Sequence, residues 1–167
     1  LLSILVKLSS KGPIIYKQER IGLNGRPFYI YKFRSMFNDS ENKGPQLSSQ
    51  HDKRITPIGK LMRRSRLDEI PQFFNVIKGE MSLVGPRPER QHYINLILEQ
   101  APHYKHIKKV KPGITSWGQV KYGYAENVEE MISRLKFDLL YVENMSLLLD
   151  FKILFYTIII MLKGSGK

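Results

Sequence analysis

The dipeptide Asn24-Gly25, set between two segments of alternating apolar and polar residues, is the feature that most restricts how this chain can fold. Asn-Gly favours the two-residue turns of β-hairpins because both residues tolerate positive φ. Residues 13–36 are therefore predicted to form a hairpin. Alternation along its second strand would place Lys32 and Arg34 on one face and the aromatic side chains on the other.

The remaining segments favour helices and loops. Residues 38–53 are polar and rich in turn formers, which predicts a surface loop. Thr56 and Pro57 are typical of an N-cap and a first helical position, so a helix is expected to begin there. Residues 99–120 indicate loop with short extended segments, whereas apolar residues at helical spacing predict a helix over residues 126–143.

The composition fits one domain with an anionic partner. The chain has 167 residues, 42% of them hydrophobic, which is enough for a single α+β domain, residues 1–167, with a β-hairpin and several helices. A formal net charge of +12 indicates nucleic acid, an acidic membrane surface or phosphate-bearing substrates as partners. The absence of cysteine excludes a disulfide framework, a thiolate zinc site and a cysteine nucleophile.

The C-terminal segment is strongly apolar. Residues 153–162 carry no charge, and Lys152 and Lys163 flank them. The uncharged run is shorter than a bilayer-spanning helix requires. Two interpretations stay open from these residues, a buried core helix and a helix that lies in an anionic membrane interface.

Two neighbouring carboxylates, Asp68 and Glu69, stand out in this basic chain. Pro71 disfavours a helical conformation at Ile70, so a helix is expected to begin at Pro71 with both acids at its N-terminus. Gly79 is expected to end that helix. One interpretation is that the two acids only complement the helix macrodipole.

The same position also suits phosphate chemistry. A helix N-terminus binds phosphate oxygens, and Arg63, Arg64 and Arg66 would neutralise further charge. Bare carboxylates would repel those phosphates unless a divalent cation bridged them. We therefore predict a Mg²⁺ site at Asp68 and Glu69, in which one of the pair binds the ion through oxygen while the other attacks phosphorus.

The Gly-Pro-Arg-Pro segment is rigid, because Pro86 and Pro88 restrict the backbone on both sides of Arg87. Its guanidinium is thereby held ready for a phosphate or a uracil edge, and the alternative is a rigid turn with a solvated arginine. Lys32 and Arg34 also allow two interpretations: their side chains bind phosphate, or they form a solvated face of the hairpin.

Four segments of the chain carry a family resemblance: YKFRSM, SRLDEIPQFFNVIKGEMSLVGPRP, KPGITSWGQV and YVENMSLLLDFKILFYTIIIMLKG. Their order and spacing resemble the bacterial sugar transferases, the monotopic polyprenyl-phosphate phosphoglycosyl transferases. The resemblance implies transfer of a sugar 1-phosphate from a UDP-sugar to polyprenyl (undecaprenyl) phosphate, which initiates capsule, O-antigen or exopolysaccharide synthesis. It further implies a Mg²⁺-assisted ping-pong mechanism at the cytoplasmic face of the bacterial inner membrane.

The resemblance also implies roles for individual residues. Asp68 resembles the nucleophile that carries the phosphosugar, and Glu69 resembles its partner near the metal. Lys32, Arg63 and Arg87 match positions that handle phosphate or nucleotide. The full set expected to bind substrate is Lys32, Arg34, Arg63, Pro86, Arg87, Pro88 and Lys121.

The chain departs from the family in three places. After GQV, many small members carry Asn-Gly-Arg where this chain has KYGYAEN, so the phosphate contact of that arginine is expected either to pass to Lys121 or to be absent. Glu80 stands where Asp is commoner. Residues 1–11 resemble only the end of an apolar helix that enters the membrane and returns, and residues 146–163 are expected to form an interfacial helix.

Two other functions remain as alternatives. A basic nucleic-acid-binding module would use Tyr29, Tyr31, Phe33 and Tyr122 as stacking platforms. That hypothesis accounts for the charge but leaves the paired carboxylates and the apolar C-terminus unexplained, so we expect no nucleic acid partner. The second alternative is a catalytically inactive scaffold in a glycan assembly complex.

Overall fold

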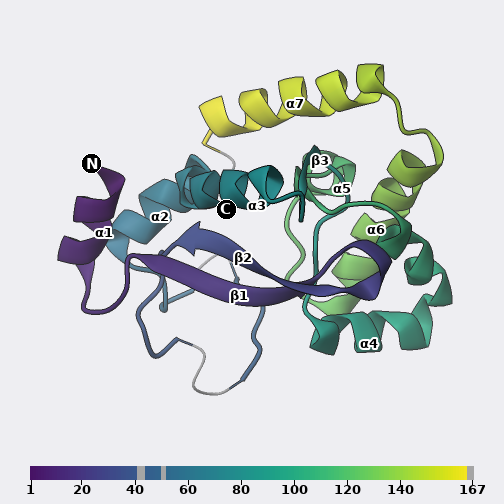
Figure 1. Ribbon diagram of the computed structural model, residues 1–167. Coiled ribbons are helices and arrows are strands. Elements are labelled where there is room, and N and C mark those ends of the chain that lie inside the picture. The colour runs from purple at the N-terminus through teal and green to yellow at the C-terminus, as the bar shows by residue number, and fades with distance from the viewer. Residues whose placement is uncertain (41–43, 50–51, 165–167) are drawn as a thin grey trace.

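The computed structural model describes residues 1–40, 44–49 and 52–164, which form an α+β fold with two small sheets (Figure 1). Parts of the predicted domain and of the predicted loop, residues 41–43, 50–51 and 165–167, lie outside the described residues. The elements in chain order are α1 (Leu2–Ser9), β1 (Ile15–Ile21), η1 (Leu23–Gly25), β2 (Pro27–Phe33), α2 (Pro57–Arg64), η2 (Leu67–Gln72), α3 (Phe73–Ile77), β3 (Ser82–Val84), α4 (Gln91–Gln100), η3 (Pro102–Lys109), β4 (Gly113–Thr115), α5 (Trp117–Lys121), α6 (Val128–Glu143) and α7 (Leu147–Leu162).

The predicted hairpin is confirmed. Strands β1 and β2 pair antiparallel, and Asn24 and Gly25 close the turn with φ of 56° and 74°. On β2, Phe28 and Ile30 point into a small apolar cluster. Lys32 follows them on this inward face, with a side chain only 17% exposed, so the interpretation of a solvated hairpin face is wrong.

The helix expected at Thr56 is also confirmed as α2. The hydroxyl of Thr56 accepts a hydrogen bond of 3.0 Å from the backbone N–H of Gly59, which satisfies one of the free donors of the first turn. The described parts of the preceding loop, residues 38–40, 44–49 and 52–53, form no helix or strand, and a bridge between Met36 and Ile55 joins the segments on its two sides.

The carboxylates do not lie at the N-terminus of a helix that begins at Pro71. They lie inside η2, a 3-10 helix that contains Pro71, and α3 begins only at Phe73. Arg66 has a φ of 55°, a left-handed conformation that ends α2 and redirects the chain into η2. Because a 3-10 helix closes shorter turns, both acids and the proline fit in one short element.

The Gly-Pro-Arg-Pro segment connects to a parallel pair of strands, β3 and β4, that the sequence did not predict as a sheet. The backbone N–H of Gly85 donates to the carbonyl of Thr115, and that of Gly113 donates to the carbonyl of Pro86. A Cβ on Gly85 would lie 2.5 Å from the carbonyl oxygen of Lys111, so the two backbones approach too closely for any side chain.

Helix α6 confirms the predicted helix and supplies much of the core. Asn127 caps it, and Met131 and Leu135 pack against α4 and η3, two helical elements that were not predicted. Within the segment expected to be loop and extended structure, α5 also forms, capped by the hydroxyl of Ser116.

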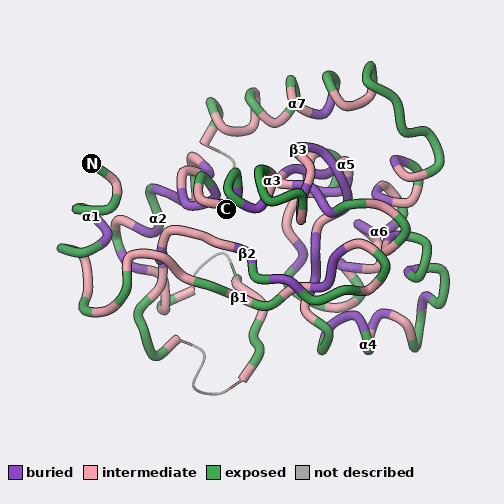
Figure 2. Tube along the Cα trace, in the orientation of Figure 1, coloured by how far each residue is buried: buried purple, intermediate pink, exposed green. Residues whose placement is uncertain are grey.

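Helix α7 lies on the surface, and the interpretation as a buried core helix is wrong. Only Ile153 of this helix is buried, whereas Leu148 and Phe151 are 82% and 70% exposed (Figure 2). Figure 1 shows α7 along the side of the molecule opposite α4. Among the helices that the structure describes, none has the length and apolar character that crossing a bilayer requires.

Candidate active site

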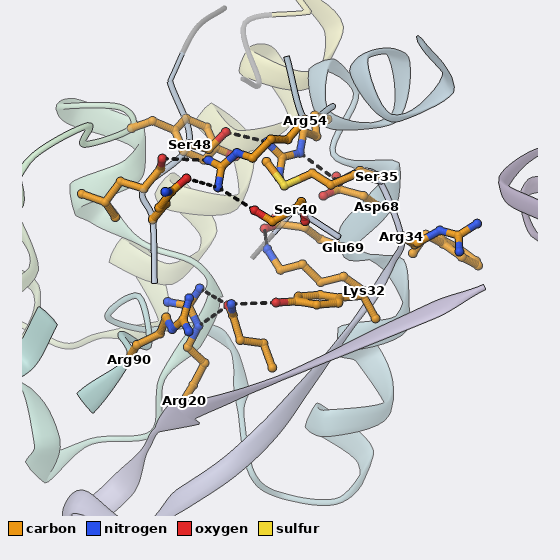
Figure 3. A pocket seen from close by; sticks show the side chains of 18 of the residues that line it. Arg20, Lys32, Arg34, Ser35, Ser40, Ser48, Arg54, Asp68, Glu69 and Arg90 are labelled. Carbon is orange, nitrogen blue, oxygen red and sulfur yellow. Dashed lines mark hydrogen bonds and ion pairs between the residues drawn. The ribbon is translucent and has the colours of Figure 1, made fainter. Parts of the chain in front are cut away.

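Asp68 and Glu69 are both buried, 6% and 4% exposed, at the inner side of η2. The turn at Arg66 brings η2 against β2, so that the two acids face the inward side of the hairpin (Figure 3). Adjacent residues of a helix point in different directions, and the two carboxylates accordingly have different surroundings.

Glu69 lies among three cations. Lys32 Nζ donates to Glu69 Oε1 at 2.8 Å, and nitrogens of Arg87 and Arg66 lie 3.7 Å and 3.6 Å from its carboxylate oxygens. Burial by itself would raise the pKa of Glu69, but these three cations outweigh it and lower the pKa to about 2. Glu69 is therefore an ionised, charge-compensated carboxylate.

Asp68 is held less firmly. Within the described chain, no other residue donates a hydrogen bond to its carboxylate. Burial and the charge of Glu69 raise the pKa of Asp68, against the opposing charges of Lys32 and Arg63. A buried carboxylate with a raised pKa and no direct hydrogen bond is poorly stabilised as an anion, which suits a group that must form a bond.

Arg63, whose positive charge acts on Asp68, is held by two hydroxyl groups of neighbouring segments. Its Nε donates to the hydroxyl of Ser35 at 2.9 Å, and a terminal nitrogen donates to the hydroxyl of Ser48 at 2.7 Å. Arg64, expected to neutralise the same site, points away and donates to the carbonyl of Gly164. Consecutive residues of α2 thus divide between the site and the surface.

A cavity of about 220 Å³ opens beside the two acids. Eight cationic and three acidic side chains line it. These are Arg20, Lys32, Arg34, Arg54, Arg63, Arg87, Arg90 and Arg134, with Asp68, Glu69 and Glu89. A cavity with this excess of cations suits a substrate that carries several negative charges.

One wall of the cavity was missed by the sequence analysis. Glu89, 5% exposed, accepts hydrogen bonds from Arg134 at 2.6 Å and from Arg20 at 3.1 Å. Arg134 comes from α6, Arg20 from β1, and Glu89 directly follows the Gly-Pro-Arg-Pro segment. No local sequence pattern could therefore have brought the three residues together. The sole local signal was an acid directly after Pro88.

Tyr124 is a second residue that the sequence analysis missed. Its ring lies 5.6 Å from the guanidinium carbons of both Arg66 and Arg87. The Nε of Arg66 is buried and has no hydrogen-bond partner in the described structure. Tyr124 lies in the KYGYAEN segment, where the chain departs from the family, and it lines the cavity.

Two predicted site residues have structural roles instead. The guanidinium of Arg34 donates to the carbonyls of Lys11 and Ser10, so it ties the end of α1 to the hairpin, although part of its side chain lines the cavity. Lys121 lies over the ring of Trp117 at 4.8 Å, beside α7, and is not among the described residues that line the cavity. In the described structure Lys121 thus lies apart from the other residues that were expected to bind phosphate.

The two prolines act through the backbone. Pro86 is fully buried, and its carbonyl accepts the hydrogen bond from Gly113. The carbonyl of Pro88 accepts a hydrogen bond from Arg20 at 3.1 Å. Both residues hold the segment that carries Arg87, and neither lines the cavity within the described structure.

The site offers two oxygen ligands for a divalent cation. In the described residues, no group of three or more histidine, aspartate or glutamate side chains could hold a metal ion by itself. Glu69 Oε2 is buried without a hydrogen-bond partner there, and Asp68 lies beside it. This set fits Mg²⁺, which commonly binds one or two carboxylates together with substrate phosphates and water.

Comparison with known proteins gives consistent matches along the chain. The family model described as bacterial sugar transferase matches residues 1–164. A UDP-N-acetylgalactosamine-undecaprenyl-phosphate N-acetylgalactosaminephosphotransferase of Aeromonas hydrophila is 44% identical over 164 residues, 98% of this chain and 39% of that protein. A UDP-glucose:undecaprenyl-phosphate glucose-1-phosphate transferase of Escherichia coli (strain K12) is 42% identical over 159 residues, 94% of this chain and 34% of that protein.

A shorter relative matches over most of its own length. The uncharacterized sugar transferase EpsL of Bacillus subtilis (strain 168) is 40% identical over 162 residues, 97% of this chain and 76% of that protein. By contrast, the chain spans only 39% and 34% of the two named transferases. The family match over residues 1–164 nevertheless covers every element of the site, and the chain belongs to the bacterial sugar transferase family.

Proposed function

We propose that this chain is the catalytic domain of an enzyme that transfers a sugar 1-phosphate from a UDP-sugar to undecaprenyl phosphate. The observation that carries the proposal is the pair of buried carboxylates, one charge-compensated and one poorly stabilised, beside a cavity lined by eight cations. The names of the Aeromonas hydrophila and Escherichia coli relatives support this choice of donor and acceptor.

Asp68 is the proposed nucleophile. Its carboxylate oxygen attacks the phosphorus that bears the sugar and forms a new P–O bond. The P–O bond to the rest of the diphosphate breaks, and its electron pair leaves with UMP. Undecaprenyl phosphate then attacks the same phosphorus and releases Asp68, so the sequence of steps is ping-pong.

The cations make this attack electrostatically feasible. A carboxylate and a diphosphate repel each other, and a positive lining offsets that repulsion before the reaction begins. Arg63 lies on the Asp68 side of the pair, whereas Lys32 and Arg87 lie on the Glu69 side. In-line phosphoryl transfer depends mainly on such positioning and charge compensation.

Mg²⁺ is the proposed cofactor, and Asp68 and Glu69 would hold it together with phosphate oxygens of the donor. When bound, the ion would neutralise charge that develops on the transferred phosphoryl group. Glu69 suits this role because it stays ionised to low pH and keeps one oxygen without a hydrogen-bond partner in the described structure.

The proposed location is the cytoplasmic face of the bacterial inner membrane. The exposed apolar side chains of α7 support an interfacial position, because a soluble surface rarely carries so many. They are Leu147, Leu148, Phe151, Phe155, Ile158 and Leu162.

The test uses the full-length protein that contains this chain, with Mg²⁺, a panel of UDP-sugars and no acceptor. UMP release and a phosphosugar adduct on Asp68, mapped by mass spectrometry, are expected. Asp68→Asn should abolish both, whereas Glu69→Gln should mainly weaken metal-dependent turnover. Glu99→Gln on the exposed surface of α4 is the matched control and should behave as the parent. An adduct on another residue, or UMP release that strictly requires the acceptor, would contradict the proposal.

A further inference from the structure

Two lysines converge on one pair of aromatic rings where α5 meets α7. Lys121 Nζ lies 4.8 Å from the ring centroid of Trp117 and 5.3 Å from that of Tyr156. Lys152 Nζ lies 5.9 Å from the ring centroid of Trp117, and the two rings are 6.2 Å apart. We name Trp117, Lys121, Lys152 and Tyr156 the aromatic-lysine cluster. None of the four is among the described residues that line the cavity beside Asp68.

The cluster keeps its positive charge. An aromatic ring attracts a cation but carries no net charge, so both ammonium groups stay available to an anion. Within the part of the chain that the structure describes, neither lysine forms a hydrogen bond or an ion pair. Asp150, the acid in the first turn of α7, instead accepts a hydrogen bond of 2.8 Å from the hydroxyl of Tyr141.

The cluster also has unused hydrogen-bond donors. The indole N–H of Trp117 and the hydroxyl of Tyr156 bind no other group among the described residues. Trp117 is half-buried, whereas Tyr156 and both lysines are exposed, so the cluster lies at the surface. Two ammonium groups, an indole N–H and a phenol hydroxyl together suit a phosphate. The rings restrain the lysine side chains, which lowers the entropy lost when an anion binds.

The position of the cluster indicates which kind of phosphate it would bind. Figure 1 shows α5 beneath α7, and Lys152 and Tyr156 lie one turn apart on α7. The same helix exposes large apolar side chains, Phe151 by 70% and Phe155 by 63%. Tryptophan, tyrosine and lysine beside an apolar surface are typical of the level of lipid headgroups, because each has an apolar body and a polar end.

A free phosphate ion would gain nothing from the apolar surface, and the phosphate of the acceptor must reach Asp68 in the cavity. We infer that the aromatic-lysine cluster binds the phosphate headgroup of an anionic bilayer phospholipid, whose acyl chains lie along the exposed apolar side chains of α7. The inference rests on the membrane location within the proposed function and is independent of the proposed chemistry. Such a lipid would hold α7 at the interface and leave the cavity open to both substrates.

Binding of phosphatidylglycerol to the detergent-purified full-length protein, measured by native mass spectrometry against phosphatidylcholine, tests this inference. Lys121→Gln with Lys152→Gln should weaken phosphatidylglycerol binding at least about tenfold, because two lysines near an anionic headgroup each add to the attraction. Lys105→Gln with Lys109→Gln removes the same charge from exposed positions on η3 and should leave the affinity within about twofold. Equal losses from the two pairs, or a parent that does not prefer phosphatidylglycerol, would overturn the inference.

Tyr156→Phe separates a built site from diffuse charge, because it removes one donor and no charge. It should weaken phosphatidylglycerol binding several-fold. Tyr29→Phe makes the same change at an exposed tyrosine on β2 and should have no effect. Unchanged binding by Tyr156→Phe would overturn the inference. Displacement of phosphatidylglycerol by an equal concentration of undecaprenyl phosphate would overturn it too, because the cluster would then be an acceptor site.

The lipid site and the proposed function can fail separately. If the parent binds phosphatidylglycerol selectively but releases no UMP from any UDP-sugar, the proposed function fails and the lipid site stands. If the parent releases UMP without binding phosphatidylglycerol selectively, the lipid site fails and the proposed function stands.

Discussion

Lys32 on β2 donates a hydrogen bond of 2.8 Å to Glu69 in η2, and this buried pair joins the hairpin to the helical element that carries both acids. The two residues are 37 positions apart in the chain. Their contact keeps Glu69 ionised and places a cation within reach of Asp68. One ion pair therefore serves both the fold and the electrostatics of the site.

Lys32→Met should reduce both stability and activity. It leaves Glu69 buried with only the more distant Arg66 and Arg87, so the free energy of unfolding should fall by about 2–3 kcal/mol. Urea unfolding followed by circular dichroism measures this change. Lys17→Met, an exposed lysine on the neighbouring strand, is the control and should change stability by less than about 0.5 kcal/mol. Equal effects of the two substitutions would contradict a special role for the buried pair.

The stability of the protein should depend on pH through Glu69. Its pKa is lowered from 4.5 to about 2, so its ionised form stabilises the fold above pH 4.5 and this contribution is lost as the pH falls from about 4.5 to about 2. Over that interval the parent should lose about 3 kcal/mol more than Glu69→Gln, as measured by urea unfolding at each pH. If the free energies of unfolding of the parent and of Glu69→Gln fell in parallel with pH, the three cations would not stabilise the charge of Glu69.

Asp68 should change the free energy of unfolding with pH in the direction opposite to Glu69. Its pKa is raised above the ordinary 3.8, so ionisation of this carboxyl destabilises the fold as the pH rises through the folded-state pKa. The parent should gain stability from Asp68 as the pH falls toward 3.8, and Asp68→Asn should lack this gain. The same unfolding series measures it, and a larger gain in the variant would contradict the raised pKa.

Gly113→Ala should disrupt the parallel strand pair that holds the Gly-Pro-Arg-Pro segment. The new Cβ would overlap the backbone nitrogen of Gly85, and neither backbone can move freely, so a loss of about 3 kcal/mol or more is expected. Gly22→Ala is the comparison, because its Cβ would meet the ring of Phe28 at 3.1 Å and the carbonyl oxygen of Arg26 at 3.6 Å, an ordinary contact distance. Thermal unfolding of both variants checks the difference, and similar melting temperatures would argue against the close approach.

The proposed position of α7 at a membrane surface can be tested by reversing the charges that flank it. Lys152 and Lys163 flank the apolar run of α7, so replacing both with Glu should reduce flotation with anionic liposomes at least about tenfold at low salt. Lys105→Glu with Lys109→Glu makes the same charge change on η3 and should have a much smaller effect. Equal losses would mean that net charge alone, and no particular face, directs binding.

Local patterns determined much of the fold from the sequence alone. Asn24-Gly25 predicted the hairpin, Thr56 predicted the start of α2, and residues 126–143 predicted α6. These features depend on turn dihedrals, capping and helical periodicity, which act over a few residues. Short elements such as β3 and β4 escaped prediction because only their mutual pairing stabilises them.

The candidate site likewise has features that the sequence predicted and features that it could not predict. Residue type and the family resemblance predicted Asp68, Glu69, Lys32, Arg63 and Arg87 as site residues, and the structure gathers these five side chains at one cavity. Their different electrostatic states could not be predicted, because a pKa depends on burial and on charges that come from distant segments.

Tertiary structure alone decided which of the many basic residues face the cavity. Lys121 was expected there, yet it packs against Trp117, and Arg34 lines the cavity while its guanidinium binds the end of α1. Glu89 and Arg134 are 45 residues apart and meet only when α6 packs beside the Gly-Pro-Arg-Pro segment. A net charge of +12 indicates an anionic partner, but the direction of each guanidinium follows from long-range packing, which no local pattern encodes.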